Sequence, residues 1–233
     1  MSGADFFDTR METVDDVVEK MDQFEKFLDE RGLESFRPFL RAYRKITLKV
    51  IQASEKDVFD NPGKLEELDI RFAEPYFEAM EKYFLEGEKK QPWKEYLNYV
   101  ERDDSRPVLE LLLGINAHIN ADLGQAMKET DYSERQDFEE INRILLEALI
   151  PVMADTAVQR KDFETLGFLG VQPVAFLGLK KVVQWREQAW KNRNKDITVL
   201  RKETERKACE LIGIRHDNSL KGLFEKPGKI LSA

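Results

Sequence analysis

The amino-acid sequence predicts an all-α fold, a single-domain bundle of about eight helices around a buried central helix near residues 106–128. Apolar residues recur at helical spacing along most of the chain, and no segment alternates apolar and polar residues as a strand does. Residues 111–127 carry one formal charge, Asp122, although 35% of the chain is Asp, Glu, Lys or Arg. A helix without a solvated face belongs in the interior of a bundle.

The bulk composition favours one domain that spans residues 1–233. The 12 glycines and 8 prolines are too scattered to form a linker. The excess of 45 acidic over 37 basic side chains argues against nucleic acid as a partner, and the apolar run at 111–127 is too short and too polar to span a membrane. A single cysteine, Cys209, and the absence of a recognisable signal peptide favour a cytoplasmic location. Association into an oligomer remains open.

Two amphipathic helices are expected within residues 12–54. Thr13 is suited to cap the first of them, and Gly32 is suited to end it. The second is expected to begin near Ser35, because Pro38 is tolerated in a first helical turn.

The next helix is expected after the turn at residues 59–63, with Asp60 or Asn61 as its cap. Its apolar face includes Phe72 and Tyr76, and Asp69 falls on the same face. A carboxylate at such a position needs a partner. A short helix should follow from Pro92 and Trp93, before the central one.

The central helix sorts into distinct faces at about 100° per residue. Gly114 and Gly124 belong to a stripe of small residues, which would let a neighbouring element approach closely. His118 and Asp122 lie together on one flank of the apolar stripe, four residues apart and within contact range. Asn116 and Asn120 lie on the other flank.

Three further helical segments are expected towards the C-terminus. The first has Asn142 inside its apolar face and Asp137 at the edge. Residues 163–179 are apolar but interrupted by glycine and proline, which favours broken helices or a buried connection. The next helix carries Arg186 and Trp190 among apolar neighbours, and residues 196–233 form a last helix and a tail packed on the bundle.

The polar residues that fall on these predicted apolar faces define a candidate site. Asp122 could orient His118 as a general acid or base, Arg186 could bind an anionic group, and Asp69 completes the candidate catalytic set. The reaction type stays open among lyase, isomerase, cyclase and hydrolase. The residues expected to contact a small-molecule substrate with an apolar or aromatic body are Asn142, Asp137, Tyr76, Phe72, Trp190, Asn116 and Asn120.

Two alternatives remain beside this interpretation. The polar groups could satisfy one another and serve only to fix the helices, in a bundle that binds a ligand or a partner protein without catalysis. Carboxylates with one histidine could also hold iron, manganese or magnesium, although the helical di-iron motifs are absent. We expect neither a metal nor another cofactor.

The chain resembles a mostly bacterial family of all-helical proteins catalogued as a domain of unknown function. The resemblance covers about residues 59–190, whereas residues 12–54 and 196–233 carry no matching motif. It implies an all-helical fold and supplies no activity. Its clearest motif is Gly-x-Asn-Ala-His-Ile-x-x-Asp-Leu, at residues 114–123, and the accompanying matches are Phe59-Asp60-Asn61-Pro62, Leu68-Asp69, Phe72-Ala73, Tyr76-Phe77, Trp93, Asp137-Phe138, Ile141-Asn142, Arg186 and Ala189-Trp190.

Overall fold

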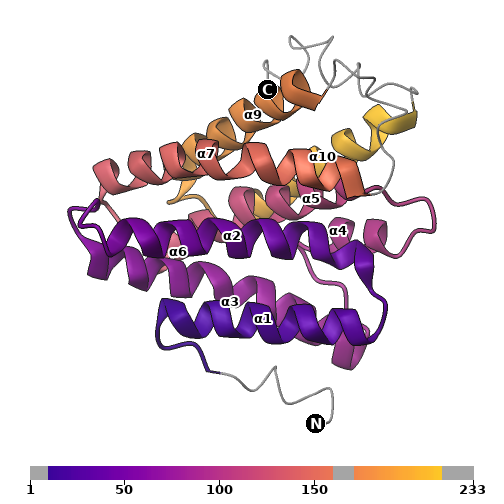
Figure 1. The fold of residues 1–233 in the computed structure, drawn as a ribbon, viewed down its shortest axis with the longest axis horizontal. Coiled ribbons are helices and arrows are strands. Elements are labelled where there is room, and N and C mark those ends of the chain that lie inside the picture. The colour runs from indigo at the N-terminus through magenta and orange to yellow at the C-terminus, as the bar shows by residue number, and fades with distance from the viewer. Residues whose placement is uncertain (1–9, 160–170, 217–233) are drawn as a thin grey trace.

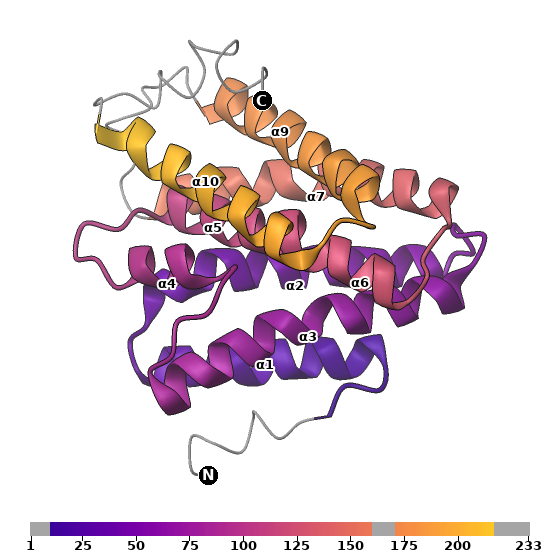
Figure 2. The same ribbon diagram turned by 180° about the vertical axis from the view of Figure 1, so that it is seen from behind.

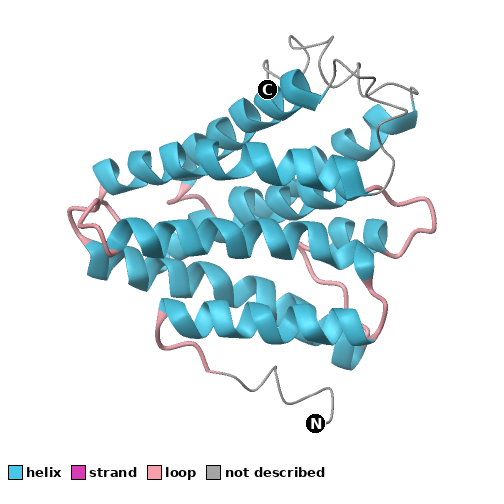
Figure 3. Ribbon diagram, viewed as in Figure 1, coloured by secondary structure: helices cyan, strands magenta, loops and turns pink. Residues whose placement is uncertain are grey.

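The computed structural model describes residues 10–159 and 171–216, and these ranges contain helices and connecting loops but no strand (Figures 1 and 3). The predicted all-helical single domain is confirmed. No helix in the described ranges has the length and apolar character that a bilayer crossing requires.

The first two helices begin and end where their capping residues predict. Helix α1 (Val14–Glu30) has a capping box in which Thr13 and Asp16 each satisfy the other's backbone N–H. Gly32 follows it with a φ of 64°, a left-handed conformation that glycine adopts without strain. A short 3₁₀ turn (Glu34–Phe36) leads into α2 (Arg37–Ser54).

Helix α3 (Pro62–Glu86) is capped by Asn61, whose side chain accepts a hydrogen bond from the Lys64 backbone. The sequence predicts that Pro75 bends or restarts this helix, and α3 includes Pro75 within a single element. Gly87, also left-handed, ends it. The short helix α4 (Lys94–Val100) follows Trp93.

The expected central helix consists of three continuous parts. Helix α5 (Pro107–Ala117) passes into a π-helical turn (His118–Asp122) and then into α6 (Leu123–Glu129). Residues 110–124 are buried without interruption. The sequence analysis did not foresee the π turn, and such single wide turns within α-helices are often found at functional sites.

Other helices surround this segment on several sides. Helix α2 lies in front of it in Figure 1, and α10 (Ile197–His216) lies in front of it in the reverse view of Figure 2. The π turn also contacts α3 and α9 (Val171–Asn192), and α5 contacts α7 (Arg135–Gln159). The buried faces of the segment therefore pack against helices from both halves of the chain.

The C-terminal half departs from the sequence expectation at one place. Helix α9 begins at Val171 instead of forming short broken pieces up to residue 179. Pro173 falls in its first turn, where a missing backbone N–H costs no helical hydrogen bond. The rest of that expected connection and the tail from residue 217 lie outside the described residues.

Gly114 shows why a small residue is needed in α5. A Cβ atom at this position would lie 2.5–2.7 Å from three side-chain carbons of Phe39 in α2. Gly124 is less constrained, because a Cβ there would meet Leu200 at 3.3 Å. The glycine at 114 thus lets the Phe39 ring pack directly on the α5 backbone.

We predict that Gly114→Ala destabilises the fold. Overpacking of a core costs about 1–3 kcal/mol, and the gain in helix propensity, roughly 1 kcal/mol, offsets only part of this. Gly63→Ala is the matched control, because a Cβ at Gly63 meets nothing within 4 Å. Urea denaturation of both variants checks the prediction. Equal stability of the two variants would show that Phe39 moves aside at no cost.

Candidate functional site

The centre of the candidate site is a buried histidine–aspartate pair at the two ends of the π turn. The Nδ1 atom of His118 lies 3.3 Å from Oδ2 of Asp122, and the indole Nε1 of Trp93 donates a hydrogen bond of 3.0 Å to the same oxygen. His118 is 4% exposed and Asp122 is 1% exposed. An ionised carboxylate only accepts, so Nδ1 then carries the imidazole proton and Nε2 presents its lone pair.

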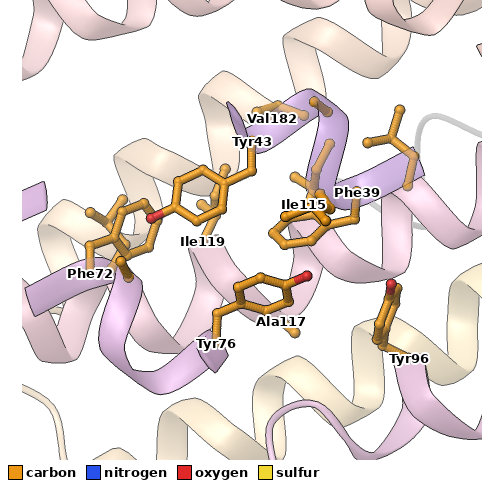
Figure 4. Close-up of a cluster of buried hydrophobic side chains, with 14 of the residues drawn as sticks. Phe39, Tyr43, Phe72, Tyr76, Tyr96, Ile115, Ala117, Ile119 and Val182 are labelled. Carbon is orange, nitrogen blue, oxygen red and sulfur yellow. The ribbon is translucent and has the colours of Figure 1, made fainter. Parts of the chain in front are cut away.

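Aromatic rings enclose the His118 imidazole. Phe72 stacks on it in parallel, with ring centroids 3.6 Å apart, and Tyr43 lies 4.5 Å away at a steep angle. Figure 4 shows Tyr43 and Phe72 side by side, with Phe39 next to them. Burial, reinforced by the positive charge of Arg186, lowers the pKa of His118 well below its usual value. The imidazole is therefore neutral at neutral pH.

A cavity of about 60 Å³ lies beside this imidazole. His118 lines the cavity, and its buried Nε2 atom has no hydrogen-bond partner within residues 10–159 and 171–216 as far as the structure describes them. The walls are mostly aliphatic and aromatic, and Figure 4 shows several of them. The lining residues are Phe39, Ala42, Tyr43, Ile46, Thr47, Val50, Leu68, Asp69, Phe72, Ile115, His118, Ile119, Leu123, Ile141, Leu145, Leu149, Val182 and Arg186.

Arg186 contributes a buried guanidinium to the cavity wall from α9. It is 4% exposed, and its Nε donates a 2.6 Å hydrogen bond to Oδ1 of Asn142 in α7. Its Nη2 atom is buried without a partner, and the guanidinium lies 4.4 Å from the ring centre of Phe138. Burial lowers its pKa to about 10, although the nearby charge of Asp69 opposes this shift.

Asp69 lines the same cavity from α3. Burial raises the pKa of its carboxyl group to about 7, while Arg186 lowers it and Glu66 adds to the rise. Asp69 and Ile46 are the two lining residues that keep partial exposure. They mark the side on which the cavity approaches solvent.

Asn142 lies next to the cavity and not on its surface. Besides accepting from Arg186, it donates a 3.2 Å hydrogen bond to Glu187, which Arg135 also binds. Phe72, by contrast, lines the cavity. The hydroxyl group of Tyr76 is buried without a partner, but the ring of Tyr76 lies one layer further out, 6.4 Å from His118.

The remaining candidate substrate contacts lie elsewhere. Both oxygens of Asp137 accept backbone hydrogen bonds, from Asp60 and from Asn61, at the start of α3. Trp190 packs on Phe138 with ring centroids 4.8 Å apart. Neither of these two candidates is among the cavity-lining residues. Their predicted substrate contacts have no support from this geometry.

Asn116 and Asn120 face α10 on the opposite side of the central segment. Asn116 donates to the Thr204 carbonyl at 3.0 Å, and Asn120 donates to Asn116 at the same distance. Lys207 then donates to Asn120. This chain of amides joins the central segment to α10.

Three contributors to the site were not proposed as functional from the sequence. Trp93 donates to Asp122, and the rings of Phe39 and Tyr43 enclose His118. Both rings lie on the apolar face expected of α2, so helical spacing marks them only as core. A buried tryptophan needs a partner for its N–H, and that requirement is the one signal that could have identified Trp93.

Metal-binding geometry is not evident among the described residues. They contain no group of three or more His, Cys, Asp or Glu side chains that could together hold an ion. Of the possible ligands considered from the sequence, Asp137 is engaged by backbone N–H groups and Asp122 by Trp93.

Comparisons with known proteins identify a family and supply no chemistry. No curated protein matches the chain, and no solved structure matches it. A family model described as "Family of unknown function (DUF5995)" matches residues 14–215 and so includes α1, α2 and nearly all of α10, beyond the range of the sequence resemblance. The chain therefore belongs to this family of unknown function.

Proposed function

We propose that the protein is a small-molecule enzyme in which His118 accepts a proton from a substrate held in the cavity. The observation that carries this proposal is that His118 lines the cavity and that its buried Nε2 atom has no hydrogen-bond partner among the described residues. Buried polar atoms nearly always have a hydrogen-bond partner in a folded protein. A bound substrate would supply the partner that the protein itself withholds.

Asp122 supports this role through the other ring nitrogen. Its carboxylate favours the tautomer with a proton on Nδ1 and stabilises the imidazolium that forms once Nε2 takes up a proton. Burial raises the pKa of Asp122 well above its usual value. The hydrogen bond from the indole N–H of Trp93 opposes this rise and so favours the ionised carboxylate. The pair thus combines a neutral resting imidazole with a carboxyl group that supplies a counter-charge in its ionised form.

Asp69 is suited to the complementary step. With a pKa of about 7, its carboxyl group carries a proton in a large share of molecules at neutral pH. Two titratable groups whose pKa values are shifted in opposite directions by their environments are typical of an acid and a base in one site. We assign proton acceptance to His118 and proton donation to Asp69, in a reaction of the lyase, isomerase, cyclase or hydrolase type.

The first prediction concerns the resting tautomer of His118. Nuclear magnetic resonance of ¹⁵N-labelled imidazole should show Nδ1 protonated and Nε2 unprotonated, without titration near pH 6.5. The chain has two histidines, so His216→Gln leaves a single set of ring signals.

Asp122→Asn supplies the contrasting case. The amide oxygen would replace the oxygen that Trp93 and His118 share. As a neutral acceptor it would hold the Nδ1 proton less firmly than a carboxylate does, so the Nε2-protonated tautomer should gain population. Identical ring signals in the Asp122→Asn variant and its parent would contradict the assigned orientation.

The second prediction concerns proton abstraction itself. In D₂O, the protein should accelerate hydrogen–deuterium exchange at a methyl group of pyruvate or acetone, followed by proton resonance. His118→Gln should slow this exchange by about 100-fold or more, because a positioned base contributes roughly 10² to 10⁴ in rate. His216→Gln is the control and should exchange at the parental rate.

The scaffold alternative makes the opposite prediction for the same variants. If the polar cluster is purely structural, His118→Gln lowers the free energy of unfolding, and the parent protein accelerates no exchange with either probe. An unchanged exchange rate in a folded His118→Gln variant would remove His118 from the proposed mechanism.

A further inference from the structure

The buried guanidinium of Arg186 forms no direct ion pair with an acidic side chain among the described residues. Its Nε is satisfied by Asn142, whereas Nη2 is buried and unpartnered. Within the described residues, no Asp or Glu forms an ion pair with it: Glu187 is taken by Arg135 and Asn142, and Asp69 acts on Arg186 only at longer range. A buried cation without a direct counter-ion is costly. An anion entering the cavity would remove that cost.

The rest of the cavity restricts what else such an anion can carry. Apart from Arg186, Asp69 and His118, its surface comes mostly from Ile, Leu, Val and Phe side chains. Its volume of about 60 Å³ corresponds to roughly four to six water-sized groups, at about 10–15 Å³ for each. This is well below the roughly 150 Å³ of a cavity that admits benzene. The aromatic body considered from the sequence is therefore too large for this cavity.

We infer that the cavity binds a short-chain aliphatic monocarboxylate, with its carboxylate on Arg186 and its apolar end among the aliphatic residues. This inference rests on the proposed function and names the substrate class for the same site. A planar carboxylate matches the fork of a guanidinium better than a spherical anion does.

Asp69 makes this binding dependent on pH. Its carboxylate would repel the ligand, so the ligand should bind the form in which Asp69 is protonated. The charged or titratable groups that act on Asp69 are Glu66 on its own helix, Arg186 on α9, Tyr43 on α2 and Tyr132 after α6, with the neutral His118 on the same cavity wall. Of these, only Arg186 favours the ionised form of Asp69.

The test is a titration of the full chain with propionate, followed by the imidazole ¹⁵N signals of His118 in the His216→Gln background. Propionamide, of the same shape but neutral, and alanine, a zwitterion, are the comparison ligands, and sodium chloride at equal concentration controls for ionic strength. Propionate should saturate the shift of the His118 signals and bind at least tenfold more tightly than propionamide.

Arg186→Gln should weaken propionate binding by about ten- to hundredfold, the range expected for losing a hydrogen bond to a charged group. Arg143→Gln is the matched control, since Arg143 lies on α7 next to Asn142 but binds Glu140 and Glu147 and does not line the cavity. It should leave the affinity within twofold. If Arg186→Gln fails to fold, Arg186→Lys replaces it and should keep the preference for propionate over propionamide.

The affinity for propionate should fall by about 30-fold between pH 6 and pH 8.5, as Asp69 ionises with a pKa of about 7. Below pH 6 the affinity should level off, because Asp69 is then almost fully protonated. Asp69→Asn should flatten this profile and retain tight binding at high pH. A profile that stays steep in this variant would overturn the role of Asp69.

The remaining outcomes separate the two proposals. If propionamide binds as well as propionate, the ligand class is wrong, while the cavity survives as a site. If alanine binds most tightly and Asp69→Asn weakens it, the site takes a zwitterion instead. If none of the three ligands shifts the His118 signals, the cavity admits no molecule of this size, and the proposed function falls together with this inference.

Discussion

The interaction on which the site depends is the sharing of one Asp122 oxygen between Trp93 and His118. All three groups are buried, so removing the carboxylate would leave two polar nitrogens without an acceptor, each at a cost of about 1–3 kcal/mol. The π turn brings His118 and Asp122 together on one side of the segment. Because Trp93 comes from the start of α4, the same oxygen also fixes the loop before α4 against this turn. The orientation of the imidazole is thus fixed by the Asp122 contact at Nδ1 and by the stacked ring of Phe72.

The guanidinium of Arg186, on α9, is also held through one of its nitrogen atoms. Asn142 holds the Nε of Arg186, Glu187 holds Asn142, and Arg135 continues this chain of hydrogen bonds towards the surface. Nδ1 of His118 and Nε of Arg186 therefore have partners, whereas Nε2 of His118 and Nη2 of Arg186 have none among the described residues. The amides of Asn116 and Asn120 contrast with this arrangement, because they bond to each other, to Thr204 and to Lys207. One network is complete and joins helices; the other is incomplete at a cavity.

Helical spacing identified three polar residues that line the cavity, but it did not identify which neighbouring element each polar side chain contacts. Asp69, His118 and Arg186 each interrupt an apolar face, and a polar residue on such a face must point into the bundle, so all three line the cavity. Spacing does not reveal which neighbouring element each face meets, which is why Asp137 and Trp190 were expected at the site although they contact the α3 loop and Phe138. The π turn contacts α3, α9 and α10, and the sequence of that segment carries no sign of it.

The distribution of unpartnered polar atoms favours a binding site over a purely structural cluster. A domain of this kind is stable by about 5–15 kcal/mol, and every buried polar atom without a partner removes about 1–3 kcal/mol of that. The hydroxyl groups of Tyr76 and Tyr132 are also unpartnered, but neither residue lines the cavity. His118 and Arg186 both line one cavity and each carries such an atom, beside a carboxyl group that is half ionised near neutral pH. In a purely structural network, polar atoms without partners would only lower the stability of the fold. In a binding site, a ligand can form the hydrogen bonds that these atoms lack.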